Sequence, residues 1–299
     1  MKIFSGSANR PLAEKIAQNL GISLSGVENH LFPDGERRIK LMEDVVDEDV
    51  LICQPTCPPV DSNLMELCLL LDAAKRSGAK NLTAVVPYLG YQRQDHIFRT
   101  GEARSLEVVV KMIEASGANC FVGVDLHSIK IPELFSIGVD HLSALPLFAE
   151  KVKQIEPDLS NACLVTPDMG GIRRIELLKN LIGGIDYVAV EKDRDIVTGK
   201  IKIARVQGEV KDICFIVDDM ISSGGTIVQC VNELFSMGAK KVFVFATHAV
   251  FSDEAPSLLE ACSAEKIYVT DTIYIPYEKQ FKKLEVLSIA PIVASSLFA

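Results

Sequence analysis

Cys214-Phe215-Ile216-Val217-Asp218-Asp219-Met220-Ile221-Ser222-Ser223-Gly224-Gly225-Thr226-Ile227 is the stretch of this sequence that decides its fold. It begins as an apolar run of the kind that forms a strand buried on both faces of a sheet. Two adjacent carboxylates, Asp218 and Asp219, end that run, and a loop of two serines and two glycines follows. Thr226 then begins an apolar-periodic segment, which predicts a helix as far as Phe235.

A strand, a loop of small residues and a helix N-terminus in this order predict a phosphate-binding site. Glycine lets the backbone approach a ligand closely, successive N–H groups of the loop point inward, and the helix dipole favours an anion. Carboxylates repel a phosphate, so we expect Asp218 and Asp219 to bind ribose hydroxyls, or a cation that the ligand carries. The alternative is an ordinary turn between strand and helix whose acidic side chains are solvated.

The composition of the chain limits its class. With 299 residues, 48% of them hydrophobic and 24% charged, the chain has material for two globular domains. The net charge of −9 argues against a nucleic-acid partner, which would require a basic face. The eight cysteines are scattered, which favours buried thiols over zinc sites or disulfides. The chain shows neither a signal-peptide pattern nor a long apolar run, so we expect a cytoplasmic protein without a membrane partner.

Strands and helices alternate along the rest of the chain. Apolar runs predict strands at 3–7, 50–54, 82–86, 120–124, 163–166, 186–190, 241–247, 266–270 and 285–289. Helical spacing of apolar residues predicts helices at 11–20, 61–77, 105–115, 145–155, 172–181 and 256–261. This alternation is typical of an α/β protein with a mostly parallel sheet, and the pattern at 200–206 predicts an antiparallel excursion.

An internal repeat predicts two similar halves. In residues 77–86 and again in residues 237–246, a helix end is followed by Gly-Ala-Lys and then by an apolar strand. We therefore expect two similar domains, at 1–145 and 146–299.

Unusual polar residues follow the predicted strands, where ligands bind in open α/β sheets. The clusters are Arg93-Gln94-Asp95, Asp125 with His127, Asp168, Lys192 with Arg194, and Asp218-Asp219. Because they come from both halves, we expect one shared site.

Two of these clusters suggest roles in the chemistry. His127 and Asp168 could bind one magnesium ion, which usually keeps water and substrate phosphates as its other ligands; a hydrogen-bonded histidine is the alternative. Lys192 and Arg194 alternate on an extended segment, so both would project to one side and could clamp a phosphoryl group in transfer. The alternative for this pair is a solvated charged loop. Neither a P-loop motif nor a dinucleotide-binding glycine motif occurs in the sequence.

Six motifs together resemble the ribose-phosphate pyrophosphokinase (PRPP synthetase) family. They occur in the family's order over about residues 3–292: Phe32-Pro33-Asp34-Gly35-Glu36, Pro87-Tyr88-Leu89-Gly90-Tyr91-Gln92-Arg93-Gln94-Asp95, Asp125-Leu126-His127-Ser128, Pro167-Asp168-Met169-Gly170-Gly171, Glu191-Lys192-Asp193-Arg194 and Val217–Thr226. The resemblance implies two type I phosphoribosyltransferase-like domains. It also implies that the chain makes 5-phosphoribosyl 1-pyrophosphate and AMP from ATP and ribose 5-phosphate, for nucleotide biosynthesis.

The resemblance also assigns the site residues. ATP would be bound by Phe32, Asp34, Gly35 and Glu36 from a neighbouring subunit, together with Arg93, Gln94 and Asp95. Magnesium would be bound by His127 and Asp168, and the catalytic residues would be Lys192 and Arg194. Ribose 5-phosphate would be bound by Arg194, Asp218, Asp219, Ser222, Ser223, Gly224, Gly225 and Thr226.

The sequence departs from many members of the family in two places. The segment 93–103 is closer to archaeal-type members, and the chain ends soon after Pro291. Both regions help to build the family's allosteric site, so inhibition by ADP, activation by phosphate and a hexameric state are in doubt. A homo-oligomer, a dimer or larger, remains expected. Two other functions stay open: a phosphoribosyltransferase that consumes the product, and a non-catalytic regulatory paralogue.

Overall fold

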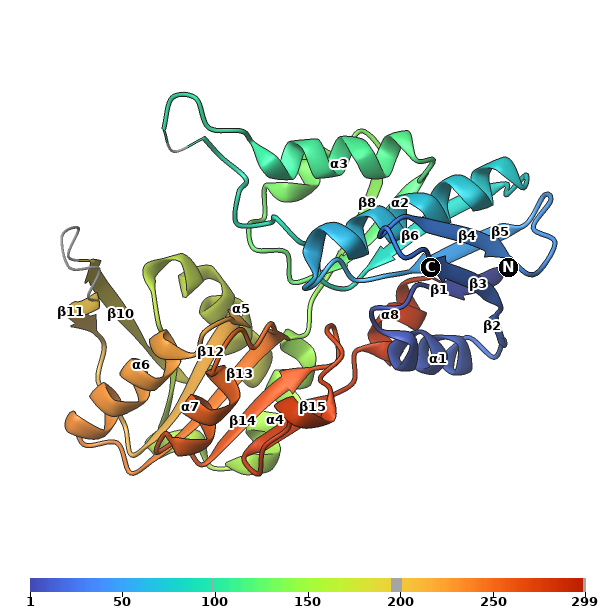
Figure 1. Ribbon diagram of the computed structural model, residues 1–299. Helices are drawn as coiled ribbons and strands as arrows, with labels where there is room; N and C mark the ends of the chain where they lie inside the picture. The colour runs from blue at the N-terminus through green and yellow to red at the C-terminus, as the bar shows by residue number, and fades with distance from the viewer. Residues whose placement is uncertain (98, 195–200, 298–299) are drawn as a thin grey trace. The chain divides into compact units, whose positions relative to one another are not determined.

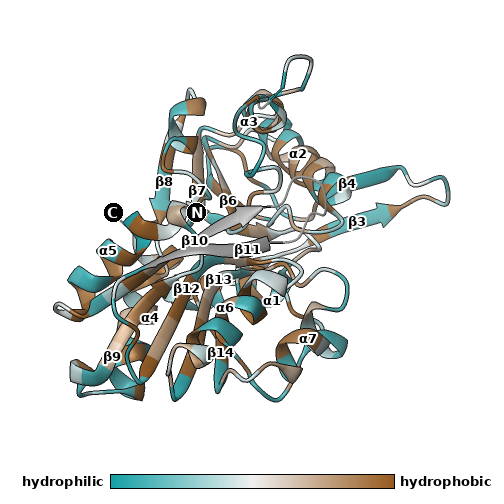
Figure 2. Ribbon diagram, turned by 90° about the vertical axis from the view of Figure 1, so that its left-hand side faces the viewer, coloured by the Kyte–Doolittle hydropathy of each residue, from teal (hydrophilic) through white to brown (hydrophobic). Residues whose placement is uncertain are grey.

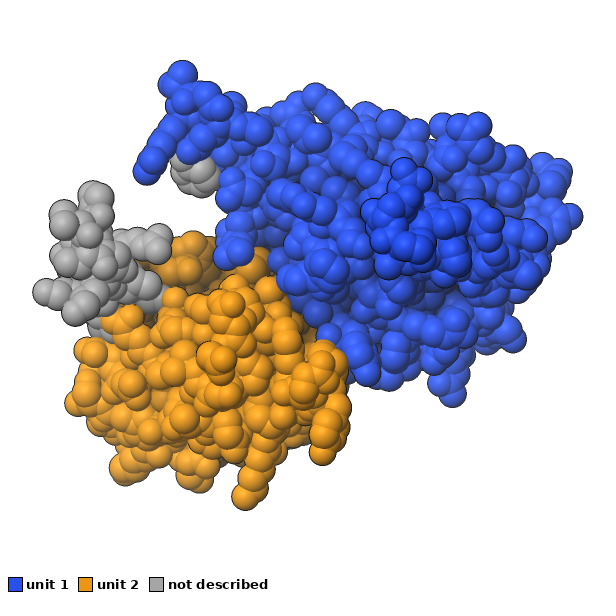
Figure 3. All heavy atoms as spheres, viewed as in Figure 1, with its two compact units in different colours: residues 1–143, 272–274, 288–299 blue, residues 144–271, 275–287 orange. Residues whose placement is uncertain are grey.

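A computed structural model describes residues 1–97, 99–194 and 201–297, and of 191–194 and 201–206 it describes only the backbone. The chain forms two compact units (Figure 3). Unit 1 comprises residues 1–143, 272–274 and 288–299, and unit 2 comprises 144–271 and 275–287. The last segment joins unit 1 because its helix, α8 (Ala290–Ser296), packs against α1 (Arg10–Asn19). In the described ranges, no helix has the length and apolar character needed to cross a membrane.

Unit 1 contains a six-stranded sheet in which every neighbouring pair is parallel (Figure 1). The strands, in spatial order, are β2 (Leu24–Ser25), β1 (Lys2–Ser5), β5 (Asp49–Cys53), β6 (Asn81–Val86), β7 (Cys120–Val124) and β8 (Gly138–Leu142). Two helices, α2 (Val60–Arg76) and α3 (Ser105–Ala115), pack against each other and supply Leu67, Leu70 and Val110 to the core. The central strands β1, β5, β6 and β7 are buried on both faces, which explains their continuous apolar runs.

A separate antiparallel hairpin belongs to the same unit. It is formed by β3 (Val27–Leu31) and β4 (Arg37–Leu41), and β4 packs against α2. The sequence predicted no strand in either segment. Most side chains of the hairpin are exposed, and Figure 2 shows its strands as largely hydrophilic, so it has no continuous apolar run that would mark it as a pair of strands.

Unit 2 contains a seven-stranded sheet with one antiparallel pair. The strands, in spatial order, are β11 (Ile201–Gln207), β10 (Asp186–Arg194), β9 (Ala162–Thr166), β12 (Ile213–Ile221), β13 (Lys241–Ala249), β14 (Lys266–Thr270) and β15 (Leu284–Leu287). The helices are α4 (Leu145–Ile155), α5 (Ile172–Ile182), α6 (Gly225–Ser236) and α7 (Ala255–Ala261). Among the described strands of unit 2, only β10 and β11 pair antiparallel, which confirms both the mostly parallel α/β fold and the antiparallel excursion.

The internal repeat has the same backbone geometry in both units. Gly78 and Gly238 end α2 and α6 with φ of 88° and 101°. The amide of the alanine after each glycine donates to a helix carbonyl, from Ala79 to Ala74 at 3.2 Å and from Ala239 to Leu234 at 3.0 Å. Both contacts are typical of a helix end that reverses through a left-handed glycine. The matching sequences therefore start matching strands, β6 and β13, in the two sheets.

Two strands of unit 2 extend further than the sequence predicted. β12 was expected to end at the carboxylates, but it continues through Asp218 and Asp219 to Ile221, because β13 pairs with it as far as Ala249. β10 was expected to end at 190, but antiparallel pairing with β11 extends it to Arg194. None of the eight cysteines, all of which lie in the described ranges, is in a disulfide.

Candidate functional site

The loop of small residues lies at the N-terminus of α6, as predicted. Gly224 precedes the helix with φ of 79°, and Gly225 is its first residue. Ser223 and Gly225 are exposed, and a Cβ atom at Gly225 would meet no other atom within 4 Å. The first N–H groups of a helix have no partner within the helix, so this loop offers donors and a positive dipole end to an anion.

A neighbouring segment that the sequence did not indicate supports this loop. The amides of Phe251 and Ser252 donate to the carbonyl oxygens of Ile221 and Ser222, each at 3.1 Å, and the hydroxyls of Ser222 and Ser252 lie 3.1 Å apart. Phe251 is buried and has φ of 44°, a strained value for a bulky residue. Such strain persists only where the surrounding contacts hold the backbone, and it often occurs at functional sites.

Asp218 and Asp219 share one cationic partner, Arg174 on α5. Nη1 of Arg174 lies 3.6 Å from Oδ1 of Asp218, and Nη2 lies 3.6 Å from Oδ1 of Asp219. Burial, the charge of Asp219 and a hydrogen bond with it raise the pKa of the Asp218 carboxyl well above its usual range, while Arg174 lowers it. The pair therefore favours a bound proton or a cationic partner that compensates its charge.

Asp168 lies at the end of β9, next to β12 in the sheet. Its Oδ1 accepts a hydrogen bond from the Gly171 amide at 3.0 Å, and its carbonyl oxygen accepts one from Thr166 Oγ1 at 2.8 Å. A Cβ atom at Gly171 would lie 2.1 Å from Thr166 Oγ1, so only glycine fits this turn without movement. The turn starts α5 and thereby fixes the position of Arg174.

The predicted catalytic pair, Lys192 and Arg194, lies in the backbone of β10. β10 neighbours β9, so the backbone of the pair lies on the strand next to the one that leads to Asp168. Their side chains, and those of the residues that pair with them on β11, lie outside the described side chains. In unit 2 the strand order therefore brings together the acid pair, Asp168, the loop of small residues and the backbone of the catalytic pair.

In unit 1 two strand-end loops are joined by Gln92. Its Oε1 accepts a hydrogen bond from the His127 amide at 3.0 Å, so the loop that carries Arg93, Gln94 and Asp95 contacts the loop after β7. Gln92 is 1% exposed, and its Nε2 has no hydrogen-bond partner among the described residues. The Leu126 amide donates to Nε2 of His141 at 2.9 Å, which adds a second contact that the sequence did not predict.

The remaining residues predicted to bind ATP lie on the turn of the β3–β4 hairpin. The Phe32 amide donates to the Glu36 carbonyl at 2.8 Å, the Glu36 amide donates to Asp34 Oδ1 at 3.1 Å, and Gly35 has φ of 92°. Phe32 is 36% exposed, and the guanidinium carbon of Arg38 lies 5.8 Å from its ring centre. The exposed ring can stack on a flat ligand.

Glu66 on α2 anchors this hairpin to the sheet. The carboxylate is fully buried and accepts hydrogen bonds from the amide and hydroxyl of Ser7 at 2.7 and 2.6 Å and from Asn29 Nδ2 at 2.8 Å. Gln54 Nε2 and Arg37 Nη1 each lie 3.3 Å from Oε2 of Glu66. One side chain therefore joins both hairpin strands to the ends of β1 and β5.

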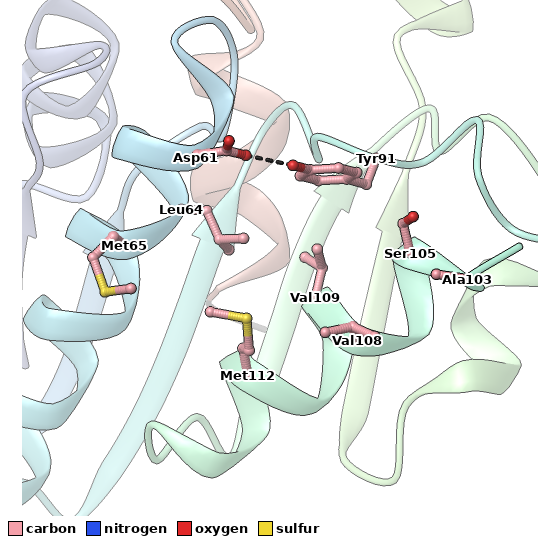
Figure 4. A pocket seen from close by; sticks show the side chains of 9 residues that line it. All are labelled: Asp61, Leu64, Met65, Tyr91, Ala103, Ser105, Val108, Val109 and Met112. Carbon is pink, nitrogen blue, oxygen red and sulfur yellow. Dashed lines mark hydrogen bonds between the residues drawn. The ribbon is translucent and has the colours of Figure 1, made fainter.

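An apolar cavity of about 380 Å³ lies between α2 and α3 (Figure 4). Its walls are formed mainly by Leu64, Met65, Val108, Val109 and Met112, and a hydrogen bond between Tyr91 and Asp61 crosses one end. No lysine or arginine lines it, so it is unsuited to a phosphate group. Apart from Tyr91, none of the motif residues lines this cavity.

The two residues predicted to bind magnesium, Asp168 and His127, differ in how well they suit this ion. Asp168 is an exposed carboxylate, and only its Oδ1 serves to cap the following turn, which suits a cation that prefers oxygen. His127 is exposed, but imidazole is a less usual magnesium ligand. Within the described ranges, no group of three His, Cys, Asp or Glu side chains could hold a metal by itself. The carboxylate of Asp168 therefore fits a magnesium ion whose other ligands are water and substrate phosphates.

Two segments of the chain match known domains. Residues 1–117 match the N-terminal domain of ribose phosphate pyrophosphokinase, and residues 191–298 match the phosphoribosyl synthetase-associated domain. The first segment contains the hairpin and the Arg93–Asp95 loop, and the second contains the acid pair and the loop before α6.

Whole proteins of known type are similar over nearly the full chain. The ribose-phosphate pyrophosphokinase of Thermotoga maritima is 38% identical over 301 residues, which cover 99% of this chain and 94% of the relative. The enzyme of the same name from Aquifex aeolicus is 38% identical over 299 residues, with coverage of 99% and 94%. The crystal structure of phosphoribosylpyrophosphate synthetase from Mycobacterium smegmatis superposes with a TM-score of 0.93 at 36% identity, covering 100% of this chain and 97% of that chain.

Proposed function

Because this chain belongs to the ribose-phosphate pyrophosphokinase family, we propose that it transfers the pyrophosphoryl group of ATP to the anomeric hydroxyl of ribose 5-phosphate. The products are 5-phosphoribosyl 1-pyrophosphate, which serves nucleotide biosynthesis, and AMP. The family relatives match both halves of the chain, so the parts predicted for the donor and for the acceptor are both present.

The acceptor, ribose 5-phosphate, binds in unit 2. Its phosphate lies at the Ser222–Thr226 loop, where N–H donors and the dipole of α6 compensate the negative charge. Its ribose hydroxyls donate to Asp218 and Asp219, which are positioned on the strand that leads into this loop. The adjacency of an acid pair and an anion-binding helix end is the observation that carries the proposal, because a sugar phosphate combines the two complementary groups.

The donor, ATP, is bound by residues of unit 1. Arg93 and Gln94 are exposed on the loop after β6, and Asp95 is buried beside them. Phe32, Asp34, Gly35 and Glu36 form the exposed turn of the hairpin. We assign this turn to the ATP site of a neighbouring subunit, so the protein works as a homo-oligomer of two or more copies.

Charge compensation and positioning account for the reaction. Transfer to a hydroxyl nucleophile needs in-line alignment and stabilisation of negative charge more than it needs a covalent intermediate. Lys192 and Arg194 supply positive charge, and Arg194 also contacts ribose 5-phosphate. His127 and Asp168 would hold Mg²⁺, which, when bound, neutralises charge on the phosphate oxygens.

A reducing compartment suits this protein. Disulfides are rare in the cytosol, where thiols are kept reduced. The eight cysteines form no disulfide, and seven of them are buried. We therefore place the enzyme in the cytoplasm.

The reaction is tested by measuring AMP release from ATP and ribose 5-phosphate with the purified protein. Formation of AMP without a nucleobase supports the proposal. A requirement for a nucleobase and for 5-phosphoribosyl 1-pyrophosphate would indicate a phosphoribosyltransferase. The absence of turnover from folded protein, with binding to an active relative, would indicate a regulatory paralogue.

The shared ATP site is tested by complementation between two inactive variants. Phe32→Ala removes the aromatic ring of the hairpin, and Asp218→Asn alters the acceptor site. If the hairpin serves a neighbour, mixed oligomers regain part of the activity, because one site then combines an intact hairpin with an intact acceptor site. Mixed oligomers that form without any recovery would contradict site sharing but not the reaction itself.

A further inference from the structure

Arg174 contacts both carboxylates of the acid pair, although no sequence pattern singled it out. Its two terminal nitrogens each lie 3.6 Å from one carboxylate, on Asp218 and on Asp219. The planar guanidinium group presents donors in a fixed fork, which suits two carboxylates on adjacent residues better than a single ammonium would. The arginine is matched to the pair in both charge and shape.

The three side chains are largely removed from solvent. The exposed fractions are 17% for Arg174, 14% for Asp218 and 7% for Asp219. Charges in such surroundings are less screened by salt and water than surface pairs. Two neighbouring carboxylates repel each other there, so an unopposed pair would separate or take up a proton.

The turn before α5 fixes the base of the arginine. Asp168 caps the Gly171 amide, and the guanidinium group of Arg174 lies beside this glycine, where a Cβ atom would be 3.6 Å from Nη1, an ordinary van der Waals contact. α5 then packs against β9, β10 and β12. The preceding residue, Arg173, is exposed, so only one of the two adjacent arginines is directed to the acid pair.

We propose that Arg174 is a positioning residue of the reaction: it holds Asp218 and Asp219 in the orientation in which they accept hydrogen bonds from the ribose hydroxyls of ribose 5-phosphate. This inference rests on the proposed assignment of the acid pair to ribose. Arg174 acts through the carboxylates, so its loss affects binding of the sugar phosphate and leaves ATP binding intact. A purely structural arginine would instead affect the folding of unit 2 and both substrates alike.

The test compares Arg174→Gln, Arg174→Lys and the neighbouring Arg173→Gln. Steady-state AMP release is measured with ribose 5-phosphate and ATP varied separately, and direct binding of ribose 5-phosphate is measured by calorimetry. Arg174→Gln should raise KM for ribose 5-phosphate about 10- to 100-fold, because misaligned carboxylates lose the charge-assisted hydrogen bonds that they accept from the sugar, and it should change KM for ATP less than about twofold. Arg174→Lys should recover part of the affinity because it keeps the charge, and Arg173→Gln should change neither constant.

The acid pair itself provides the second arm of the test. Asp218→Asn and Asp219→Asn should also raise KM for ribose 5-phosphate. If neither does, the assignment of the pair to ribose is wrong. If they do but folded Arg174→Gln binds ribose 5-phosphate as the unaltered enzyme does, the positioning role alone is wrong. Should Arg174→Gln fail to fold, Arg174→Lys decides. The proposal is overturned either by a KM for ribose 5-phosphate equal to that of Arg173→Gln or by an equal rise of KM for ATP and for ribose 5-phosphate.

Discussion

Replacing Glu66 by alanine is expected to destabilise unit 1 strongly. The carboxylate is the acceptor for both donors of Ser7, for Asn29 and for Gln54, and it forms an ion pair with Arg37. It is fully buried, and the Arg37 side chain is 14% exposed. One substitution therefore removes the common partner of four segments of the chain.

The magnitude follows from what the substitution leaves unpaired. Removing one member of a buried ion pair costs about 3–5 kcal/mol, because the other charge remains without compensation. Arg37 keeps a hydrogen bond to Asn29 Oδ1 at 2.7 Å, and water can reach Ser7, which reduces the cost. Gln54 stays fully buried with its amide poorly bonded, which adds about 1–3 kcal/mol. We expect a net loss of about 3–5 kcal/mol.

Calorimetry measures this loss as a shift in Tm. For a unit of this size each kcal/mol lowers Tm by about 2–4 °C, so Glu66→Ala should lower the Tm of unit 1 by about 6–20 °C. The matched control is Glu14→Ala. That residue forms an exposed helical ion pair with Arg10 at 2.8 Å, and its removal should cost about 0.3–0.5 kcal/mol. Glu66→Gln, which keeps the volume and one acceptor, should fall between the two.

The same substitution has a functional readout. The hairpin loses its anchor, so Glu66→Gln should raise KM for ATP at a temperature where it is folded and leave KM for ribose 5-phosphate unchanged. A Tm within about 2 °C of the unaltered protein for Glu66→Ala would refute the reasoning, because that value corresponds to an exposed and replaceable carboxylate. An equal rise of both KM values would refute the link between the anchor and the ATP hairpin.

Three further outcomes are expected. Lys192→Ala should reduce turnover in the AMP-release assay about 10²–10³-fold or more at saturating substrates, and unchanged turnover would exclude a catalytic role. Burial raises the pKa of the Asp218 carboxyl, so the folded chain retains a proton that the unfolded chain loses near pH 4. This carboxyl lowers stability progressively as the pH rises above 4, and Asp218→Asn should raise the free energy of unfolding by about 0.5–2 kcal/mol at pH 8 but not at pH 4, in denaturant titrations. Gly171→Ala places a Cβ 2.1 Å from Thr166 Oγ1 and should cost about 1–3 kcal/mol, whereas Gly225→Ala, with open space around it, should cost less than 1 kcal/mol.

The buried parts of the fold were predictable from local pattern. The helices at 105–115 and 145–155 and the strand at 120–124 begin and end where their apolar spacing predicted. The elements that the sequence did not predict include an edge strand. β8 lies at the edge of the six-stranded sheet, where it pairs with β7, and most of its side chains are exposed, so its sequence has no continuous apolar run. The ends of β10 and β12 were misjudged because pairing with a neighbouring strand extends them across charged residues.

The site residues that could be predicted lie where an apolar run of the sequence ends. Polar or small residues interrupt such a run at Asp168, at Asp218 and in the loop before α6. Arg174, Gln92 and Glu66 lie in segments with an ordinary polar pattern. Their importance arises from contacts with residues distant in sequence; Ser7 and Glu66, for example, are 59 residues apart. The local pattern of apolar and polar residues does not indicate such contacts.

Backbone strain adds support for the same two regions. Five non-glycine residues in the described ranges have positive φ: Asp47, Tyr91, Asp125, Phe251 and Asp253. Such conformations cost free energy, so they persist where tertiary contacts hold them. All but Asp47 lie in strand-end loops of the proposed site. Each holding contact joins a motif to a segment outside the motifs: the Leu142 carbonyl accepts from the Asp125 amide at 2.8 Å, and the Ile221 carbonyl accepts from the Phe251 amide. The motifs therefore supply the reactive groups, while their geometry also depends on neighbouring segments of the sheets.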